Sequence, residues 1–332
     1  MTTRLRVVVV GLGFGQWLIE HELLEGEGAR VCELVGVCDL DAGRTEEVAQ
    51  RYGVRAYADV DAVLTDPDVD AVVLMVGPDG RGALVERAVA AGKPVMTTKP
   101  FETSSAAALA ALTAARAAGI PVFMNSPTPT PEADIQVIEE WAHRLRLGRP
   151  VGYRGTTWCS YREQPDGSWY DDPQRAPAAP LTRLGVYLIA DVCRLLGPID
   201  RVQVAESRLF TGRPTSDNAA VLLSHADGTI GSVFSSFCID DGQPYRTSLE
   251  LNFERGTVYR NVGPGTGERM HLAVSAMVDG ERVVEEREVD RPSGYQWDVF
   301  ARAARGEDVG ETVTPEAVAQ IVAVFEALRA AT

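Results

Sequence analysis

Short apolar runs alternate with longer helical stretches through the first 125 residues of the chain. The runs are rich in β-branched residues and cover 7–10, 34–38, 71–76, 94–97 and 121–124. The stretches between them are rich in Ala, Leu and Glu and cover 14–25, 42–52, 80–91 and 103–118. Continuous apolar strands separated by helices are typical of a parallel sheet that is covered on both faces. We therefore predict a doubly wound α/β domain over 1–125.

A different pattern follows this domain. The stretch 126–132 contains three prolines and indicates a crossover between domains. Beyond it we expect a helix near 132–147, one long apolar helix at 182–196, two closing helices at 294–305 and 314–330, and several strands. Consecutive strands joined by short turns predict a mostly antiparallel sheet, so 126–332 is expected to form one α+β domain. The expected strands cover 151–161, 201–211, 218–224, 229–237, 246–253, 256–260, 270–277 and 282–289.

Charge and cysteine content narrow the classes of partner. The chain has 32 Lys and Arg against 47 Asp and Glu, a formal net charge of −15. Such an acidic surface repels phosphate backbones and anionic lipids, so we expect neither nucleic acid nor a membrane surface as partner. The five cysteines form no C-x-x-C pair and no cluster with zinc-ligand spacing, so no metal site is expected. Cys32 and Cys38 lie in an apolar run, which predicts reduced, buried thiols and a cytoplasmic protein. No secretory leader or membrane-spanning stretch is expected.

A glycine-rich turn follows the first apolar run and precedes a helical stretch. It reads Gly11-Leu-Gly13-Phe14-Gly15-Gln16. Gly11 allows the tight turn, and Gly13 lets the main chain approach a pyrophosphate at the helix N-terminus. This context predicts a dinucleotide site that includes Phe14 and Gly15. The usual fingerprint has its third glycine where this chain has Gln16, so we expect the packing of helix on strand to differ there.

An acidic residue stands at the end of the second strand. Asp39 is expected to accept hydrogen bonds from the ribose hydroxyls of the dinucleotide, because this position commonly does so. Its negative charge disfavours a 2′-phosphate, which favours NAD over NADP. Arg44 follows one turn later and could hold a 2′-phosphate, so NADP stays open as the alternative cofactor.

The chain resembles the Gfo/Idh/MocA oxidoreductases, which include glucose–fructose oxidoreductase and inositol dehydrogenase. The resemblance spans nearly the whole sequence. It implies a Rossmann domain followed by a domain with a large open sheet. It also implies NAD(P)-dependent oxidation or reduction of a sugar, a cyclitol or a related polyol by a homodimer or homotetramer. The motifs that carry the resemblance are Gly11-Leu-Gly13 and the segments 37–41, 66–72, 91–100 and 184–197.

Two motifs of this family are changed here. Lys99 matches the lysine of the family's Glu-Lys-Pro motif, although Thr98 replaces the glutamate. The resemblance gives Lys99 a role in catalysis and in holding the cofactor. The second motif has an aspartate where this chain has Arg183 and a histidine where it has Tyr187. Lys99 and Tyr187 are therefore the predicted acid/base residues, with a core tyrosine as the alternative for Tyr187.

Arg183 has three possible roles. Its charge could lower the pKa of Lys99, clamp a carboxylate or phosphate of an acidic substrate, or form a structural ion pair with Asp191. Asp191 lies near the family's second acidic helix position and is a predicted substrate ligand together with Arg183. Tyr161 and Arg162 belong to a segment rich in aromatic and charged residues, as sugar sites are, and are also predicted to bind substrate. A surface loop is the alternative for them.

These observations predict an enzyme that transfers a hydride between nicotinamide and a sugar, cyclitol or related polyhydroxylated substrate, which could be acidic. One alternative is a nucleotide-binding sensor or regulatory protein that has lost catalysis, because Thr98 and Arg183 replace motif residues. The other alternative is a reductase of another hydride class, which would act on imines or dihydrodiols.

Overall fold

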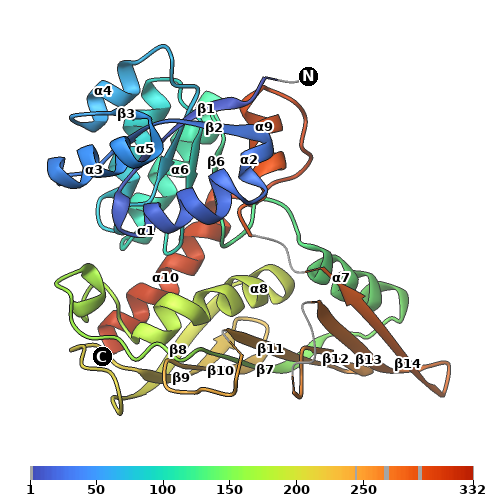
Figure 1. The fold of residues 1–332 in the computed structure, drawn as a ribbon. Helices are drawn as coiled ribbons and strands as arrows, with labels where there is room; N and C mark the ends of the chain where they lie inside the picture. Colours follow the sequence, from blue (N-terminus) through green and yellow to red (C-terminus); the bar gives the residue numbers. More distant parts are fainter. Residues whose placement is uncertain (1–2, 244, 265–268, 291–293, 332) are drawn as a thin grey trace. The chain divides into compact units, whose positions relative to one another are not determined.

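The computed structural model describes residues 3–243, 245–264, 269–290 and 294–331. It divides the chain into two compact units. The first unit comprises Met1–Thr130 and Ser293–Val318, and the second comprises Pro131–Pro292 and Ala319–Thr332. Figure 1 shows both, coloured along the sequence. No helix of the described residues is long and apolar enough to cross a bilayer.

The first unit is built on a six-stranded, all-parallel sheet in the order β3-β2-β1-β4-β5-β6. Its central strands are apolar and almost completely buried, as expected for a sheet with helices on both faces. The order reverses between β1 and β4, and ligands bind at such switch points. The strands are β1 (Leu5–Val10), β2 (Cys32–Cys38), β3 (Arg55–Ala56), β4 (Ala71–Leu74), β5 (Val95–Thr97) and β6 (Val122–Met124).

The helices of this unit begin and end where the sequence provides caps. Asp41, Asp59 and Ser104 each accept a main-chain N–H of the helix that follows, and Gly53 and Gly119 end helices in the left-handed conformation. The predicted helix 14–25 consists of two pieces, an α-helix and a π-helical continuation. The elements are α1 (Leu12–Leu18), η1 (Ile19–Leu24), α2 (Gly28–Val31), α3 (Ala42–Tyr52), α4 (Val60–Thr65), α5 (Arg81–Ala90) and α6 (Ser105–Ala118).

A late segment of the chain completes the first unit. Helix α9 (Trp297–Ala304) buries Trp297 and Phe300 in the same core as Val9 and Leu18. The Trp297 indole N–H donates to a carboxylate oxygen of Glu22 over 2.8 Å. The structure thus differs from the predicted division at residue 125, because the apolar face of α9 is buried in the first core.

The second unit is an eight-stranded sheet in the order β14-β13-β12-β11-β7-β10-β9-β8. Neighbouring strands are antiparallel except for the parallel pair β7 and β10, which agrees with the predicted, mostly antiparallel sheet. The strands are β7 (Pro150–Trp158), β8 (Ile199–Ser207), β9 (Asn218–His225), β10 (Ile230–Ser236), β11 (Arg246–Phe253), β12 (Gly256–Arg260), β13 (Met270–Val278) and β14 (Glu281–Val289).

Helices cover one face of this sheet. Figure 1 shows α7 (Ala133–Arg144) and α8 (Val186–Leu196) on the same side of it. Trp141 of α7 and Leu188 of α8 are fully buried with the inward side chains of the strands. A short π-helical segment, η3 (Leu181–Gly185), leads into α8, and α10 (Pro315–Ala331) closes the chain.

The other face of the sheet exposes its side chains, because burial alternates along the strands. Leu222 of β9 and Ile230 of β10 lie on this face and are 58% and 62% exposed. Met277 of β13 and Val284 of β14 lie on it as well and are about half exposed. We call these four side chains the open face.

Candidate active site

The glycine turn between β1 and α1 can be built only around Gly11. Gly11 has a φ of +89°, a conformation that L side chains rarely adopt. A Cβ atom there would come within 2.8–2.9 Å of main-chain atoms of Met75 and Val76, which follow β4. Its own N–H donates to the carbonyl of Cys38 at the end of β2. Gly11 therefore joins the ends of three adjacent strands.

The next two glycines of the turn have different surroundings. A Cβ atom on Gly13 would meet no protein atom within 4 Å, whereas one on Gly15 would come within 3.0 Å of a Val9 methyl. Gly15 therefore has the helix-packing role of the usual third glycine, one position early, which explains how Gln16 is tolerated. The lack of a side chain at Gly13 leaves space beside the N-terminus of α1, where the N-cap residue Gly11 has no side chain to bond the main-chain N–H groups. Such a cradle fits a pyrophosphate.

Asp39 is tied to the same turn. One carboxylate oxygen accepts the Leu12 N–H over 2.6 Å and the other accepts the Asp41 N–H over 3.0 Å. The Arg44 guanidinium lies 3.7 Å from the carboxylate and is half exposed. Asp39 thus stabilises the turn and keeps lone pairs for ribose hydroxyls. Phe14, also predicted at this site, is 41% exposed and stacks on Trp17 with 5.2 Å between ring centroids.

Lys99 lies directly after β5, in a loop held by buried polar groups. Arg81, which is 1% exposed, donates hydrogen bonds to the carbonyls of Val76, Thr98 and Pro100. The Lys99 main-chain N–H and the Thr98 hydroxyl both donate to the side-chain oxygen of Asn125 over 3.2 Å. Thr98 therefore fixes the loop in the place of the motif glutamate.

The carboxyl ends of parallel strands lie at one edge of a sheet. Gly11 and Gly13 follow β1, Asp39 follows β2, and Lys99 follows β5, so all of these residues belong to the same edge. This is the edge at which open α/β sheets bind their ligands. The sequence analysis did not identify Arg81, because its acceptors are carbonyls that only the loop conformation brings together.

In the second unit, Arg183 is enclosed by protein groups. Its two terminal nitrogens donate to the two carboxylate oxygens of Glu163 over 2.6 and 2.9 Å. Its guanidinium carbon lies 3.9 Å from the ring centroid of Tyr170 and 5.4 Å from that of Tyr161. Glu163 also accepts from Arg213, which reaches two further carboxylates. The sequence analysis missed Glu163, because nothing local indicates a pair separated by twenty positions.

A structural ion pair was one of the three roles considered for Arg183, and its partner is Glu163 where the sequence analysis had named Asp191. Asp191 accepts a hydrogen bond from Arg260 over 2.7 Å, and the same guanidinium donates to Asp134 over 2.6 Å. Arg260 is only 4% exposed, so these charges are matched where water is scarce. The carboxylate of Asp191 thus contributes to joining α7, α8 and β12. Burial raises the pKa of Asp191.

The remaining predicted side chains of the second unit differ in exposure. Tyr187 is half-buried against the main core, which agrees with the core tyrosine considered as its alternative. Tyr161 is 39% exposed, with its ring 5.7 Å from that of Phe237. Arg162 is exposed and lies over the Phe210 ring at 5.3 Å. Tyr161 thus belongs to the aromatic surroundings of Arg183, whereas Arg162 faces away to a different ring.

A titratable group that the sequence analysis missed lies at the start of α7. Burial raises the pKa of Glu132 to about 8, and the negative charges of Asp134 and Asp191 contribute to the increase. Arg260 and Arg194 oppose it. Glu132 can therefore hold or release a proton near neutral pH, next to the carboxylate of Asp191.

Together, the parallel sheet, the glycine turn and Asp39 define a dinucleotide-binding protein with a second domain built on an open sheet. The family model described as "Oxidoreductase family, NAD-binding Rossmann fold" matches residues 5–126. The "GFO/IDH/MocA C-terminal domain" model matches residues 135–259. The chain belongs to the GFO/IDH/MocA family of oxidoreductases.

Similar proteins carry the names of dehydrogenases. D-apiose dehydrogenase of Paraburkholderia graminis is 28% identical over 262 residues, which cover 77% of this chain and 67% of that relative. An inositol 2-dehydrogenase of Acidothermus cellulolyticus is 36% identical over 116 residues, or 34% of each chain. The crystal structure of GenD2 from gentamicin A biosynthesis, in complex with NAD, superposes with a TM-score of 0.74 at 25% identity. That match covers 100% of this chain and 95% of GenD2.

These comparisons confirm the predicted family, the fold class and the NAD-binding character of the first domain. They also confirm that the chain is an oxidoreductase. All five cysteines are free, and Cys32, Cys38 and Cys159 are buried, as predicted for the first two. Burial raises the pKa of Cys32 to about 12, so its thiol is unreactive at neutral pH.

Proposed function

We propose that the chain is an NAD-dependent dehydrogenase of a polyhydroxylated small molecule, a sugar or a cyclitol. The observation that carries this proposal is the placement of Lys99, which buried groups anchor at the sheet edge shared with Gly13 and Asp39. The relatives named for D-apiose and inositol support the substrate class. An anchored lysine at a dinucleotide edge provides an acid/base group for a substrate hydroxyl.

The residues of the first unit have distinct roles in this proposal. Bound NAD would supply a hydride acceptor at its nicotinamide ring. The cradle at Gly13 binds the pyrophosphate, and Asp39 accepts hydrogen bonds from the ribose hydroxyls. Lys99 takes the proton of the substrate hydroxyl as it is oxidised and returns it in the reverse direction. Tyr187 is the second acid/base candidate, and Tyr161 and Arg162 are proposed contacts of the substrate.

Arg183 is proposed as a positioning residue. Glu163 matches its charge and uses both terminal nitrogens. A guanidinium paired in this way has little capacity left for a substrate carboxylate, so we do not propose a preference for acidic sugars. The pair instead orients Tyr161 and Tyr170, whose rings lie over the cation.

Steady-state kinetics with NAD tests the proposal. D-apiose, myo-inositol, levoglucosan and a uronic acid are assayed by NADH absorbance, with wild-type protein and the Lys99→Met variant. We expect turnover of at least one neutral polyol, and a decrease in kcat of about 100-fold or more in Lys99→Met with NAD affinity retained. Binding of NAD without turnover of any polyol would contradict the proposal and favour the sensor. Turnover that is unchanged in Lys99→Met would remove Lys99 from catalysis.

We also propose a cytoplasmic homo-oligomer, a dimer or a tetramer. The free, buried thiols support a reducing compartment. The open face supports self-association, because four large apolar side chains lie on it without a helix of their own unit above them. Leu222 and Ile230 lie on neighbouring strands, as do Met277 and Val284, and exposed apolar side chains of this kind are found in contact surfaces.

A further inference from the structure

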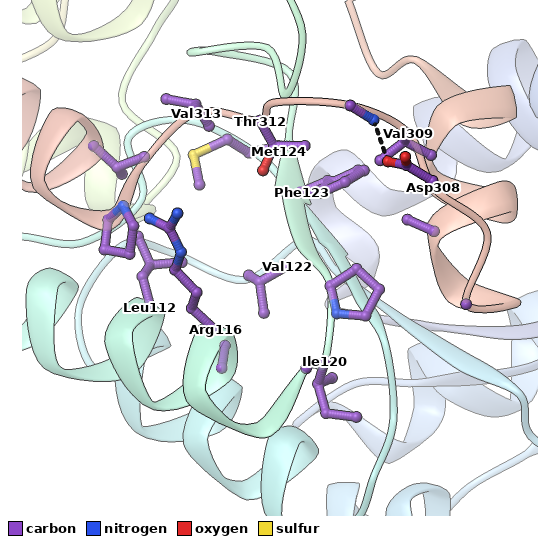
Figure 2. Close-up of a pocket in the computed structure, with 18 of the residues that line it drawn as sticks. Leu112, Arg116, Ile120, Val122, Phe123, Met124, Asp308, Val309, Thr312 and Val313 are labelled. Carbon is purple, nitrogen blue, oxygen red and sulfur yellow. Dashed lines mark hydrogen bonds between the residues drawn. The ribbon is translucent and has the colours of Figure 1, made fainter.

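A groove of about 360 Å³ lies in the first unit, away from the glycine turn. Its walls are the C-terminal half of α6, the strand β6 and the segment that follows α9, as Figure 2 shows. β6 is the last strand of the sheet, and β5 and β4 separate it from β1. The groove is therefore distinct from the site of the dinucleotide. Its volume lies at the lower end of the range for small-molecule sites.

The walls are mostly apolar. Leu112 comes from α6, Val122 and Met124 come from β6, and Val309 and Val313 come from the segment after α9. Figure 2 shows Val309 and Val313 on opposite sides of Met124. Where these side chains reach the groove they can contact a small hydrocarbon group, and each CH₂ that is buried there contributes about 0.8 kcal/mol.

One positively charged side chain, that of Arg116, lines this groove. Arg116 extends from α6 toward Met124 and Val313 in Figure 2. Among the described residues, Arg116 forms no ion pair and no side-chain hydrogen bond. The positive charge of Arg116 makes a minor contribution to lowering the pKa of Glu316, which a hydrogen bond from the main-chain N–H of Glu316 lowers most. The guanidinium is thus available to an anion.

The two acidic side chains of the groove are already engaged. Glu307 pairs with Arg302 over 3.2 Å, and Asp308 accepts the Gly310 N–H over 2.8 Å, the bond drawn in Figure 2. Their charges nevertheless remain in the wall and repel a dianion. A ligand with a single negative charge is therefore favoured over a phosphate.

The outer edge of β6 also presents main-chain polar groups to the groove. The Val95 N–H donates to the Pro121 carbonyl, and Val95 pairs with Val122 in register. In a parallel pair, alternate residues direct their main-chain groups to the neighbour, so those of Val122 point away from β5. Val122 is partly exposed and lines the groove, so it presents an N–H and a carbonyl there.

We infer that this groove is a binding site for a small monocarboxylate with a branched or aromatic apolar body. Arg116 binds the carboxylate, and the apolar walls from Leu112 to Val313 hold the body. The charge of Arg116 among apolar groups distinguishes this occupant from an uncharged hydrophobe. The site is independent of the dehydrogenase activity proposed above.

Methyl NMR of the full chain with labelled methionine tests this site, because Met124 lines it. The probes are 4-methylpentanoate and its uncharged amide, 4-methylpentanamide, and Met124→Leu assigns the resonance. We expect the carboxylate to shift the Met124 methyl signal at millimolar concentration and the amide to bind at least about tenfold more weakly. The Met270 and Met277 methyl signals, from the second unit, should not move.

Substitutions of Arg116 test whether its charge binds the carboxylate. Arg116→Gln should reduce carboxylate binding to the level of the amide, and Arg116→Lys should restore part of it. Arg30→Gln removes the same charge from an exposed arginine of the same unit and should leave binding unchanged. Equal binding of both probes, or no shift with the carboxylate, would overturn the inference. A Met124 shift that depends on protein concentration alone would assign the groove to a second copy of the chain and would also overturn it.

Discussion

Gly13 and Gly15 stand two positions apart, yet the structure predicts opposite outcomes for the same substitution. Gly13→Val places its side chain in open space, so the protein should keep its melting temperature and lose NAD binding. Gly15→Val drives its side chain into Val9, and overpacking of this kind costs about 1–3 kcal/mol. Calorimetric titration with NAD and thermal unfolding of both variants check this. NAD affinity that is unchanged in Gly13→Val would contradict the cofactor site.

Asp39 has two functions that substitution can separate. Asp39→Ala removes the acceptor for ribose hydroxyls and the acceptor of the Leu12 N–H. NAD binding should weaken by about tenfold or more, whereas NADP binding should weaken less, because Arg44 becomes free to meet a 2′-phosphate. Calorimetric titration of wild type and variant with both nucleotides measures how much affinity is lost for NAD and how much for NADP. An equal loss for NAD and NADP would show that the turn, and not ribose recognition, depends on Asp39.

From the sequence alone, residue-level prediction could reach the features that depend on local backbone geometry. Gly11 and Asp39 could be found because strand ends and the glycine turn are local features. The pairs of Arg183 with Glu163 and of Asp191 with Arg260 could not, because they join distant segments and no local pattern specifies the partner. The role of Arg81 could not be predicted either, because its carbonyl acceptors come together only when β4 and β5 are paired in the sheet.

At the scale of elements, the strands and helices were predicted within a few residues, because apolar periodicity and caps are local. The short elements were missed, since two to six residues carry too little periodicity; these are β3, α4, α2 and the 3₁₀ turn Trp169–Asp171. The helix predicted over 182–196 contains a π-helical first turn at η3, with Arg183 in it.

The Glu163–Arg183 pair connects a loop to η3, and its strength depends on pH. Burial alone would raise the pKa of Glu163. The hydrogen bonds and positive charges of Arg183 and Arg213 outweigh this effect and lower the pKa below its usual 4.5. A lowered pKa in the folded state adds stability above about pH 4.5, and this stability is lost as the pH falls further.

Glu163→Gln should therefore lower the free energy of unfolding by about 3 kcal/mol at pH 7, the lower end for a buried pair, since Glu163 is 29% exposed. The difference from wild type should shrink below about pH 4.5. Urea unfolding at several pH values measures it, with Asp172→Asn as a control of equal charge change in the same loop. A difference that is constant with pH would contradict the ion-pair origin.

At the scale of the whole molecule, the open face predicts the assembly. Ile230→Lys places a charge among the exposed apolar side chains of this face, and burying an unpaired charge in an interface is unfavourable. Sedimentation should show a decrease in oligomer size with an unchanged circular dichroism spectrum. Leu209→Lys, which alters an exposed loop residue outside the sheet, should leave the assembly intact. A monomeric wild-type protein would contradict the proposal.

The return of α9 to the first unit has a consequence for biosynthesis. The core around Val9 and Leu18 also requires Trp297 and Phe300, which leave the ribosome long after residue 130. At roughly 5–20 residues per second, the nascent Rossmann sheet waits on the order of 10 to 40 s for its last helix. During that interval an apolar surface of the emerging chain lacks its cover. Nascent chains arrested before α9 should therefore recruit chaperones, and those arrested well beyond residue 318 should release them.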